Sequence, residues 1–172
     1  MDPGNLRDTS SLDDLRDLLA GLGAELASGS LLGWASPGDV SDVPGEVYRT
    51  IATAGLLGEG DPQFAASVPA NATALMSLLW EVDEPTAIGV LTSLTDAAGT
   101  PRAHQRGVRR RYQQDPRDIF GEIARLLGPG TQWWTNTDLT TWNPVTARPF
   151  DAVVAAAGNG VIVTLVAFED GG

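Results

Sequence analysis

The sequence predicts an α+β fold in which N-terminal and central helices pack on a small C-terminal antiparallel β-sheet. Apolar residues recur at helical spacing over much of 1–130, whereas residues 131–170 hold two alternating apolar runs joined by Gly158-Asn159-Gly160. With 172 residues, 42% of them hydrophobic, we expect one domain over 1–172. Its mainly helical part is 1–130, and its β part, 131–170, is not expected to fold independently.

The first predicted helix carries leucines at helical spacing from Leu12 to Leu26. Ser11 is its predicted N-cap, and the helix ends near Ala20 or near Ala27. A second helix is predicted to start at Pro44, because proline suits the first helical turn, and to be broken by 58–60. Asp61-Pro62 is expected to open a short helical turn.

The middle of the chain is less regular. Residues 28–43 are rich in Ser, Gly, Asp and Pro and are predicted to be a loop, with Leu31, Leu32 and Trp34 as buried anchors. A third helix is predicted over 70–81. Residues 86–98 suit either a strand or a helix, and we favour the helix because of the punctuation at both of its ends.

A strong helix is predicted from Asp115-Pro116 to Gly128-Pro129-Gly130, followed by the β-hairpin. Both hairpin runs are apolar on both faces, which is typical of central, covered strands. We therefore expect helices on at least one face of the sheet. Residues 131–148 should supply one or two more strands, and 28–43 or 86–95 another.

The composition disfavours many chemistries. The chain has no cysteine and one histidine, His104, which lies among arginines, so we assign no catalytic residue, no metal ligand and no cofactor. Phosphate-binding glycine motifs and lysine are both lacking. The acidic N-terminus does not resemble a secretory signal and no apolar run approaches bilayer length, so we expect a cytoplasmic protein that does not bind membranes.

The net charge of −11 disfavours nucleic acid as a partner. One basic region, 102–125, nevertheless holds 7 arginines against 3 acids. Arginines can grip phosphate or carboxylate groups in a forked geometry, although pairing with the chain's own acids is the favoured interpretation here. The candidate anion-binding residues are Arg102, Arg106, Arg109 and Arg110.

Three of the five tryptophans fall within ten residues, at 133, 134 and 142. Adjacent residues of a strand point to opposite faces, so we expect at most one of Trp133 and Trp134 to enter the core. Core or edge cover is the favoured role for the cluster, with partner binding as the alternative. The candidate partner-binding residues are Trp133, Trp134, Asp138 and Trp142.

These features predict a non-enzymatic acidic protein-binding module. An immunity protein or antitoxin that neutralises a basic partner, such as a bacterial toxin, is its concrete form. The first alternative is a small-ligand-binding or enzyme scaffold with a Trp-lined pocket. The second is a structural or assembly subunit of a phage or secretion particle. The sequence does not determine the oligomeric state.

Overall fold

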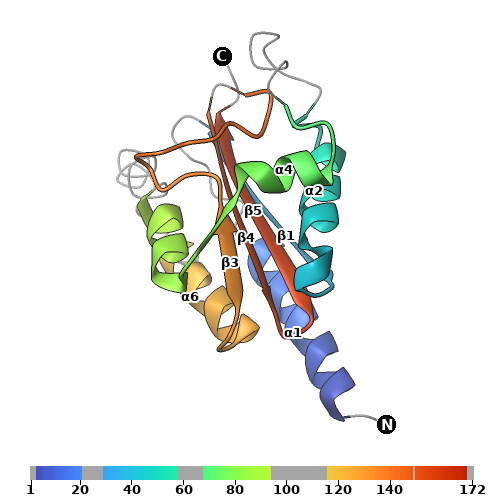
Figure 1. The fold of residues 1–172 in the computed structure, drawn as a ribbon. Helices are drawn as coiled ribbons and strands as arrows, with labels where there is room; N and C mark the ends of the chain where they lie inside the picture. Colours follow the sequence, from blue (N-terminus) through green and yellow to red (C-terminus); the bar gives the residue numbers. More distant parts are fainter. Residues whose placement is uncertain (1–2, 21–28, 58–67, 94–115, 149, 170–172) are drawn as a thin grey trace.

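The protein has an antiparallel five-stranded sheet with helices on both faces (Figure 1). The computed structural model describes residues 3–20, 29–57, 68–93, 116–148 and 150–169. The strand order is β1-β5-β4-β3-β2, with every neighbouring pair antiparallel. The strands are β1 (Gly29–Pro37), β2 (Trp80–Val82), β3 (Gln132–Thr135), β4 (Asp151–Gly158) and β5 (Val161–Glu169). The predicted α+β class is confirmed.

The helices follow the predicted order with shifted ends. They are α1 (Pro3–Ala20), the 3₁₀ helix η1 (Val40–Asp42), α2 (Val43–Thr53), α4 (Ala72–Leu78), a helix over 84–93 and α6 (Pro116–Leu127). Ser11 lies inside α1, so its prediction as N-cap is wrong; the helix already begins at Pro3, a residue suited to a first turn. The predicted turn at Asp61-Pro62 lies outside the described residues.

The ambiguous segment 86–98 is helical as far as it is described, to residue 93. Its start is set by Asp83, whose carboxylate accepts a hydrogen bond from the Thr86 backbone N–H at 2.8 Å. This is the N-cap arrangement that favoured the helix over the strand. Within the described parts of the chain, no helix is long and apolar enough to cross a membrane.

The hairpin of β4 and β5 lies in the middle of the sheet, as predicted. Asn159 and Gly160 have φ of 51° and 74°, the left-handed values that a tight two-residue hairpin turn requires. Alternate residues of β5 enter different cores: Val163 and Leu165 pack on the α1 side, whereas Ile162 and Val166 pack on the α2 side. The runs are apolar on both faces because both faces are covered.

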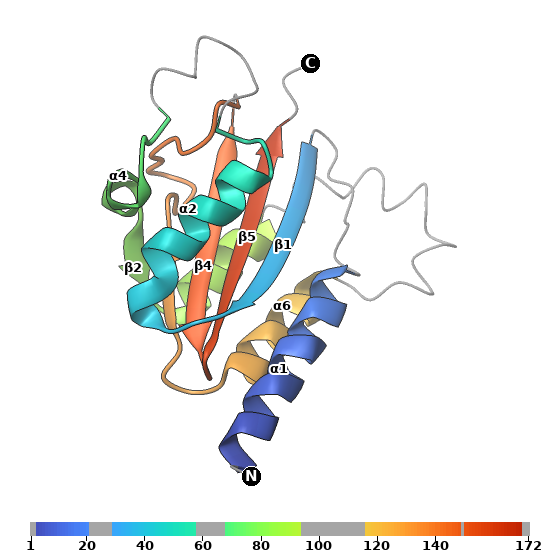
Figure 2. The same ribbon diagram turned by 90° about the vertical axis from the view of Figure 1, so that its right-hand side faces the viewer.

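Helices therefore cover the sheet on both sides (Figure 2). One core joins the sheet to α1, α6 and the helix over 84–93, and the other joins it to α2 and α4. Trp133 lies in the first core and Trp134 in the second, with exposures of 1% and 8%. The expectation that at most one of them enters the core is wrong, because each face of the sheet has its own core.

The loop prediction for 28–43 is wrong for its first part, which forms β1, whereas the alternative that 28–43 supplies a further strand is confirmed. This strand pairs with β5 along its whole length, from Gly29↔Glu169 to Pro37↔Val161. Leu31 and Ala35 pack on the α1 side, whereas Trp34 packs on the α2 side. Pairing and burial on both faces outweigh the weak strand preference of the flanking glycine, serine and proline.

Candidate functional site

The segment 136–150 joins β3 to β4 at one end of the sheet (Figure 1). A buried carboxylate holds this segment in place. Asp151, the first residue of β4, is fully buried. Among the residues that the structure describes, its oxygens accept hydrogen bonds from five donors and form no ion pair, and these bonds satisfy the buried carboxylate. The donors are Asn136 Nδ2 at 2.7 Å, Trp142 Nε1 at 3.3 Å, Val145 N at 3.1 Å, Thr146 N at 2.7 Å and Thr146 Oγ1 at 2.9 Å.

Asn136 extends this network across the sheet end. Its Oδ1 accepts from Val153 N at 2.6 Å, and its Nδ2 also donates to Asn143 O at 3.0 Å. Asn143 Nδ2 in turn donates to Leu78 O, at the end of α4, at 3.1 Å. A satisfied buried network of this kind rigidifies the segment that it holds.

The tip of this segment, residues 138–141, lies beyond the network and reaches solvent. We call these four residues the loop tip. An isolated bridge between Thr137 and Trp142 closes its base. The tip is thereby a tight turn on a braced support rather than a free loop.

Two side chains of the loop tip combine charge with apolar surface. Asp138 Oδ1 accepts from Thr141 N at 2.6 Å, Thr140 Oγ1 at 2.7 Å and Thr140 N at 2.9 Å. These bonds, led by the Thr141 backbone N–H, hold the pKa of Asp138 below its ordinary value, so its charge is kept. Beside it, Leu139 is 47% exposed and has a φ of 75°, an unusual backbone for a bulky residue.

The predicted partner-binding residues divide between surface and core. Asp138 is exposed, and Trp142 is half-buried with its ring centroid 5.6 Å from that of Phe150. Trp133 and Trp134 are buried, so neither side chain is open to a partner. The candidate anion-binding residues Arg102, Arg106, Arg109 and Arg110, together with His104, lie outside the described residues.

The residues of this site that were not predicted include Asn136, Leu139 and Asp151. A signal for Asp151 was present, since it is a lone acid at the start of a strand that is apolar on both faces. Such an acid must find donors inside the protein, and the preceding segment, rich in Asn and Thr, supplies them. Leu139 had no comparable signal, because its exposure depends on how the loop folds.

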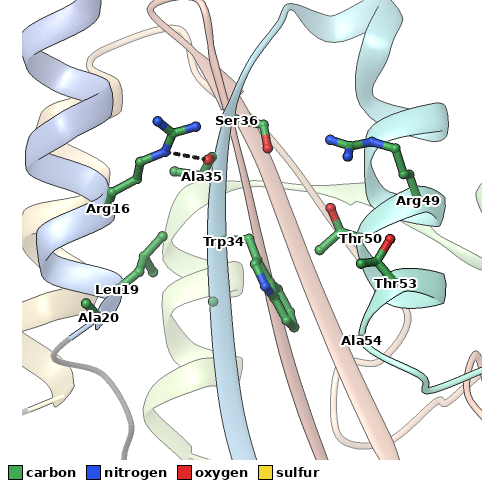
Figure 3. Close-up of a pocket in the computed structure, with 11 residues that line it drawn as sticks. Arg16, Leu19, Ala20, Trp34, Ala35, Ser36, Arg49, Thr50, Thr53 and Ala54 are labelled. Atoms are coloured by element: carbon green, nitrogen blue, oxygen red, sulfur yellow. Dashed lines mark hydrogen bonds between the residues drawn. The ribbon is translucent and has the colours of Figure 1, made fainter.

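A second feature is a groove of about 520 Å³ at the outer edge of β1 (Figure 3). α1 contributes Arg16 and Leu19 to one wall, and α2 contributes Arg49, Thr50 and Thr53 to the other. Residues 33–36 of β1 lie between the walls, with the Trp34 ring on the α2 side. We call this space the β1 groove; it contains none of the predicted site residues.

The two arginines of the β1 groove are held differently. Arg16 Nε donates to the Ala35 carbonyl at 3.2 Å. Arg49 forms an ion pair with Glu46, one turn earlier in α2. Burial opposes ionisation of Glu46, but hydrogen bonds from Ser36 and Arg49 outweigh it and hold the pKa of Glu46 below its ordinary value. Arg49 is thus neutralised within its own helix.

Within the described ranges, no three His, Asp or Glu side chains gather closely enough to hold a metal ion. Comparisons with family models, with curated proteins and with solved structures found no match. The structure therefore defines the protein by its fold. It is an α+β protein with an antiparallel sheet covered by helices on both faces, a braced loop tip and an open groove at one edge of the sheet.

Proposed function

We propose that the protein is a non-enzymatic protein-binding module whose contact surface is the loop tip. The observation that carries this proposal is Leu139, an exposed leucine kept at positive φ on a segment braced by Asp151. Unusual backbone conformations of this kind cluster at binding sites and persist only where the surroundings enforce them. A rigid apolar anchor loses little conformational entropy when it binds.

The charge of the loop tip supports a basic partner. Asp138 uses Oδ1 for its three hydrogen bonds, and Oδ2 has no partner among the described residues. That oxygen remains open to an arginine or lysine of another protein. The net charge of −11 would also steer a basic partner toward the protein and would make association sensitive to salt.

An immunity protein or antitoxin that neutralises a basic toxin is the specific form of this proposal. A subunit of a phage or secretion particle would use the same kind of surface. The small-ligand alternative draws on the β1 groove, whose aromatic wall is Trp34 rather than the predicted tryptophan cluster. We favour the protein partner because the loop tip presents a charged and an apolar side chain to solvent.

The test compares baits in affinity capture from a lysate of the source organism. Leu139→Gly removes the side chain and suits a φ of 75°, so the fold should be kept. Asp138→Asn keeps an Oδ1 acceptor and removes the charge. Val40→Ala, at another exposed apolar residue, serves as the matched control.

We expect the unmodified bait and the Val40→Ala bait to retain one basic protein in stoichiometric amount, released by high salt. The Leu139→Gly bait should recover at least tenfold less of this protein. The Asp138→Asn bait should still bind it, but with a weaker dependence on salt. Equal recovery by the unmodified and Leu139→Gly baits would exclude the loop tip as the contact surface.

A further inference from the structure

The outer edge of β1 has backbone groups that no described strand pairs. β1 is the terminal strand of the described sheet, bonded to β5 on its inner side. Gly38 N donates to Gly160 O at 2.9 Å, which marks residue 38 as a hydrogen-bonded position of this antiparallel pair. Because such positions alternate, the N–H and C=O groups of Leu31, Gly33 and Ala35 point outward.

One hydrogen bond confirms this orientation. Arg16 reaches the Ala35 carbonyl from α1, outside the sheet, at 3.2 Å. That carbonyl therefore faces away from β5, as the alternation requires. From residue 31 to residue 35 the outward groups extend over roughly 13 Å, at about 3.3 Å per residue.

The β1 groove places the outward groups of Gly33 and Ala35 at the bottom of a slot, and those of Leu31 continue the same edge beyond it. Its lining comes from α1, which covers one face of the sheet, and from α2, which covers the other (Figure 3). A space bounded by both helices passes around the strand edge, where an added strand would lie about 4.8 Å from β1. Gly33 lets α1 pack close to β1 at the wall of the slot, since a Cβ there would lie 2.6 Å from Leu19 Cδ2.

The two helices that wall the slot favour a single extended chain over a second copy of this protein. A second copy pairing through its own β1 would bring its α1 and α2 alongside the strand. These helices would meet the α1 and α2 that wall the groove. An isolated extended segment carries no flanking layers and meets no such obstacle.

The charge in the slot favours an acidic segment. Arg16 has no ion-pair partner in the part of the chain that the structure describes, and it uses only Nε for the bond to Ala35. Its two terminal nitrogens can take a carboxylate in a forked geometry. Arg49, on the opposite wall, is already paired with Glu46.

We propose that the β1 groove binds an extended acidic segment of another polypeptide, which adds to the sheet along Leu31–Ala35 and places an Asp or Glu side chain against Arg16. Backbone hydrogen bonds would supply affinity, and Arg16 would supply preference for acidic sequences. This site is separate from the loop tip and does not depend on it. The competing explanation is that Arg16 merely protects an edge strand from aggregation, and this predicts no peptide binding.

The test begins with a selection of random octapeptides, displayed on phage, on the full chain. The best sequence is then synthesised with a fluorescent label, and its Kd is measured by fluorescence anisotropy. We expect enrichment of alternating β-branched residues with one Asp or Glu. Failure to enrich any such sequence would overturn the proposal.

Variants then locate the bound peptide. Ala35→Pro removes an outward N–H that β5 does not use, and Arg16→Glu reverses the charge; each should weaken binding at least tenfold. Arg125→Glu makes the same change in net charge at an exposed position of α6 and should leave the Kd within about twofold of the unmodified value. Leu139→Gly should also leave it unchanged.

A charge exchange keeps the test decisive if Ala35→Pro fails to fold. A peptide in which Lys replaces the acidic residue should not bind the unmodified protein, but it should bind the Arg16→Glu variant. A peptide Kd that neither Arg16→Glu nor Ala35→Pro changes would overturn the proposal. So would a dimer that Arg16→Glu dissociates, because a second copy would then be the occupant.

Discussion

Replacing Asp151 by asparagine tests the buried network that braces the loop tip. The substitution keeps the shape of the side chain but exchanges one acceptor oxygen for an NH₂ donor. In one orientation the new donor faces Thr146 N, which lies 2.7 Å from Oδ2. In the other it faces Asn136 Nδ2, which lies 2.7 Å from Oδ1. In either orientation, therefore, the new NH₂ donor faces another hydrogen-bond donor and neither finds an acceptor.

The magnitude follows from the groups left unpaired. A buried donor without an acceptor costs about 1–3 kcal/mol, so Asp151→Asn should lower the free energy of unfolding by about that amount. Asp151→Ala removes both oxygens and leaves the buried backbone N–H groups of Val145 and Thr146 unpaired. We expect a loss of about 3–5 kcal/mol for that variant.

The assay is urea denaturation followed by tryptophan fluorescence, with linear extrapolation to water. Asp13→Asn, on the exposed face of α1, is the control and should change stability by less than about 0.5 kcal/mol. If Asp151→Asn unfolds at the same urea concentration as the unmodified protein, the carboxylate does not brace the loop and the argument fails.

Three further predictions concern individual positions. Gly158→Ala should destabilise the protein more than Gly33→Ala. A Cβ at residue 158 would lie 2.7 Å from the Leu127 backbone carbonyl, whereas at Gly33 the closest atoms belong to side chains that can shift. Thermal unfolding of the two variants checks this order. Gly33→Ala itself should cost about 1–3 kcal/mol by overpacking against Leu19. The pKa of Asp138 is lowered in the folded state, so its contribution to stability is present above the unfolded-state pKa and is lost as the pH falls through the folded-state pKa. A carboxyl NMR titration should give a midpoint below that of an unperturbed aspartate.

The sequence predicted those parts of the fold that depend on local pattern. The Asp115-Pro116 start and Gly128 stop of α6, and the Asn159-Gly160 turn, each rest on a few neighbouring residues with strong conformational preferences. The central position of β4 and β5 followed from their apolar residues on both faces. These elements needed no knowledge of distant contacts.

The rest depended on partners far along the chain. β1 is a strand because it pairs with β5, about 130 residues later, and because its side chains pack into the two cores on either face of the sheet. Both Trp133 and Trp134 are buried for the same reason, since α2 and α4 close the second face. The sequence predicted only part of the candidate site. It named Asp138 and Trp142, which lie in the braced segment, but it did not indicate Leu139, whose exposure depends on how the loop folds.

The most direct test of the central claim is site-specific photo-crosslinking in a lysate of the source organism, with a benzophenone amino acid in place of Leu139. The same group in place of Val40 serves as the control. We predict one crosslinked basic protein from position 139 and none from position 40, with the yield falling as salt is raised. Absence of a crosslink at 139, or the same products from both positions, would contradict the assignment of the loop tip as a protein-binding surface.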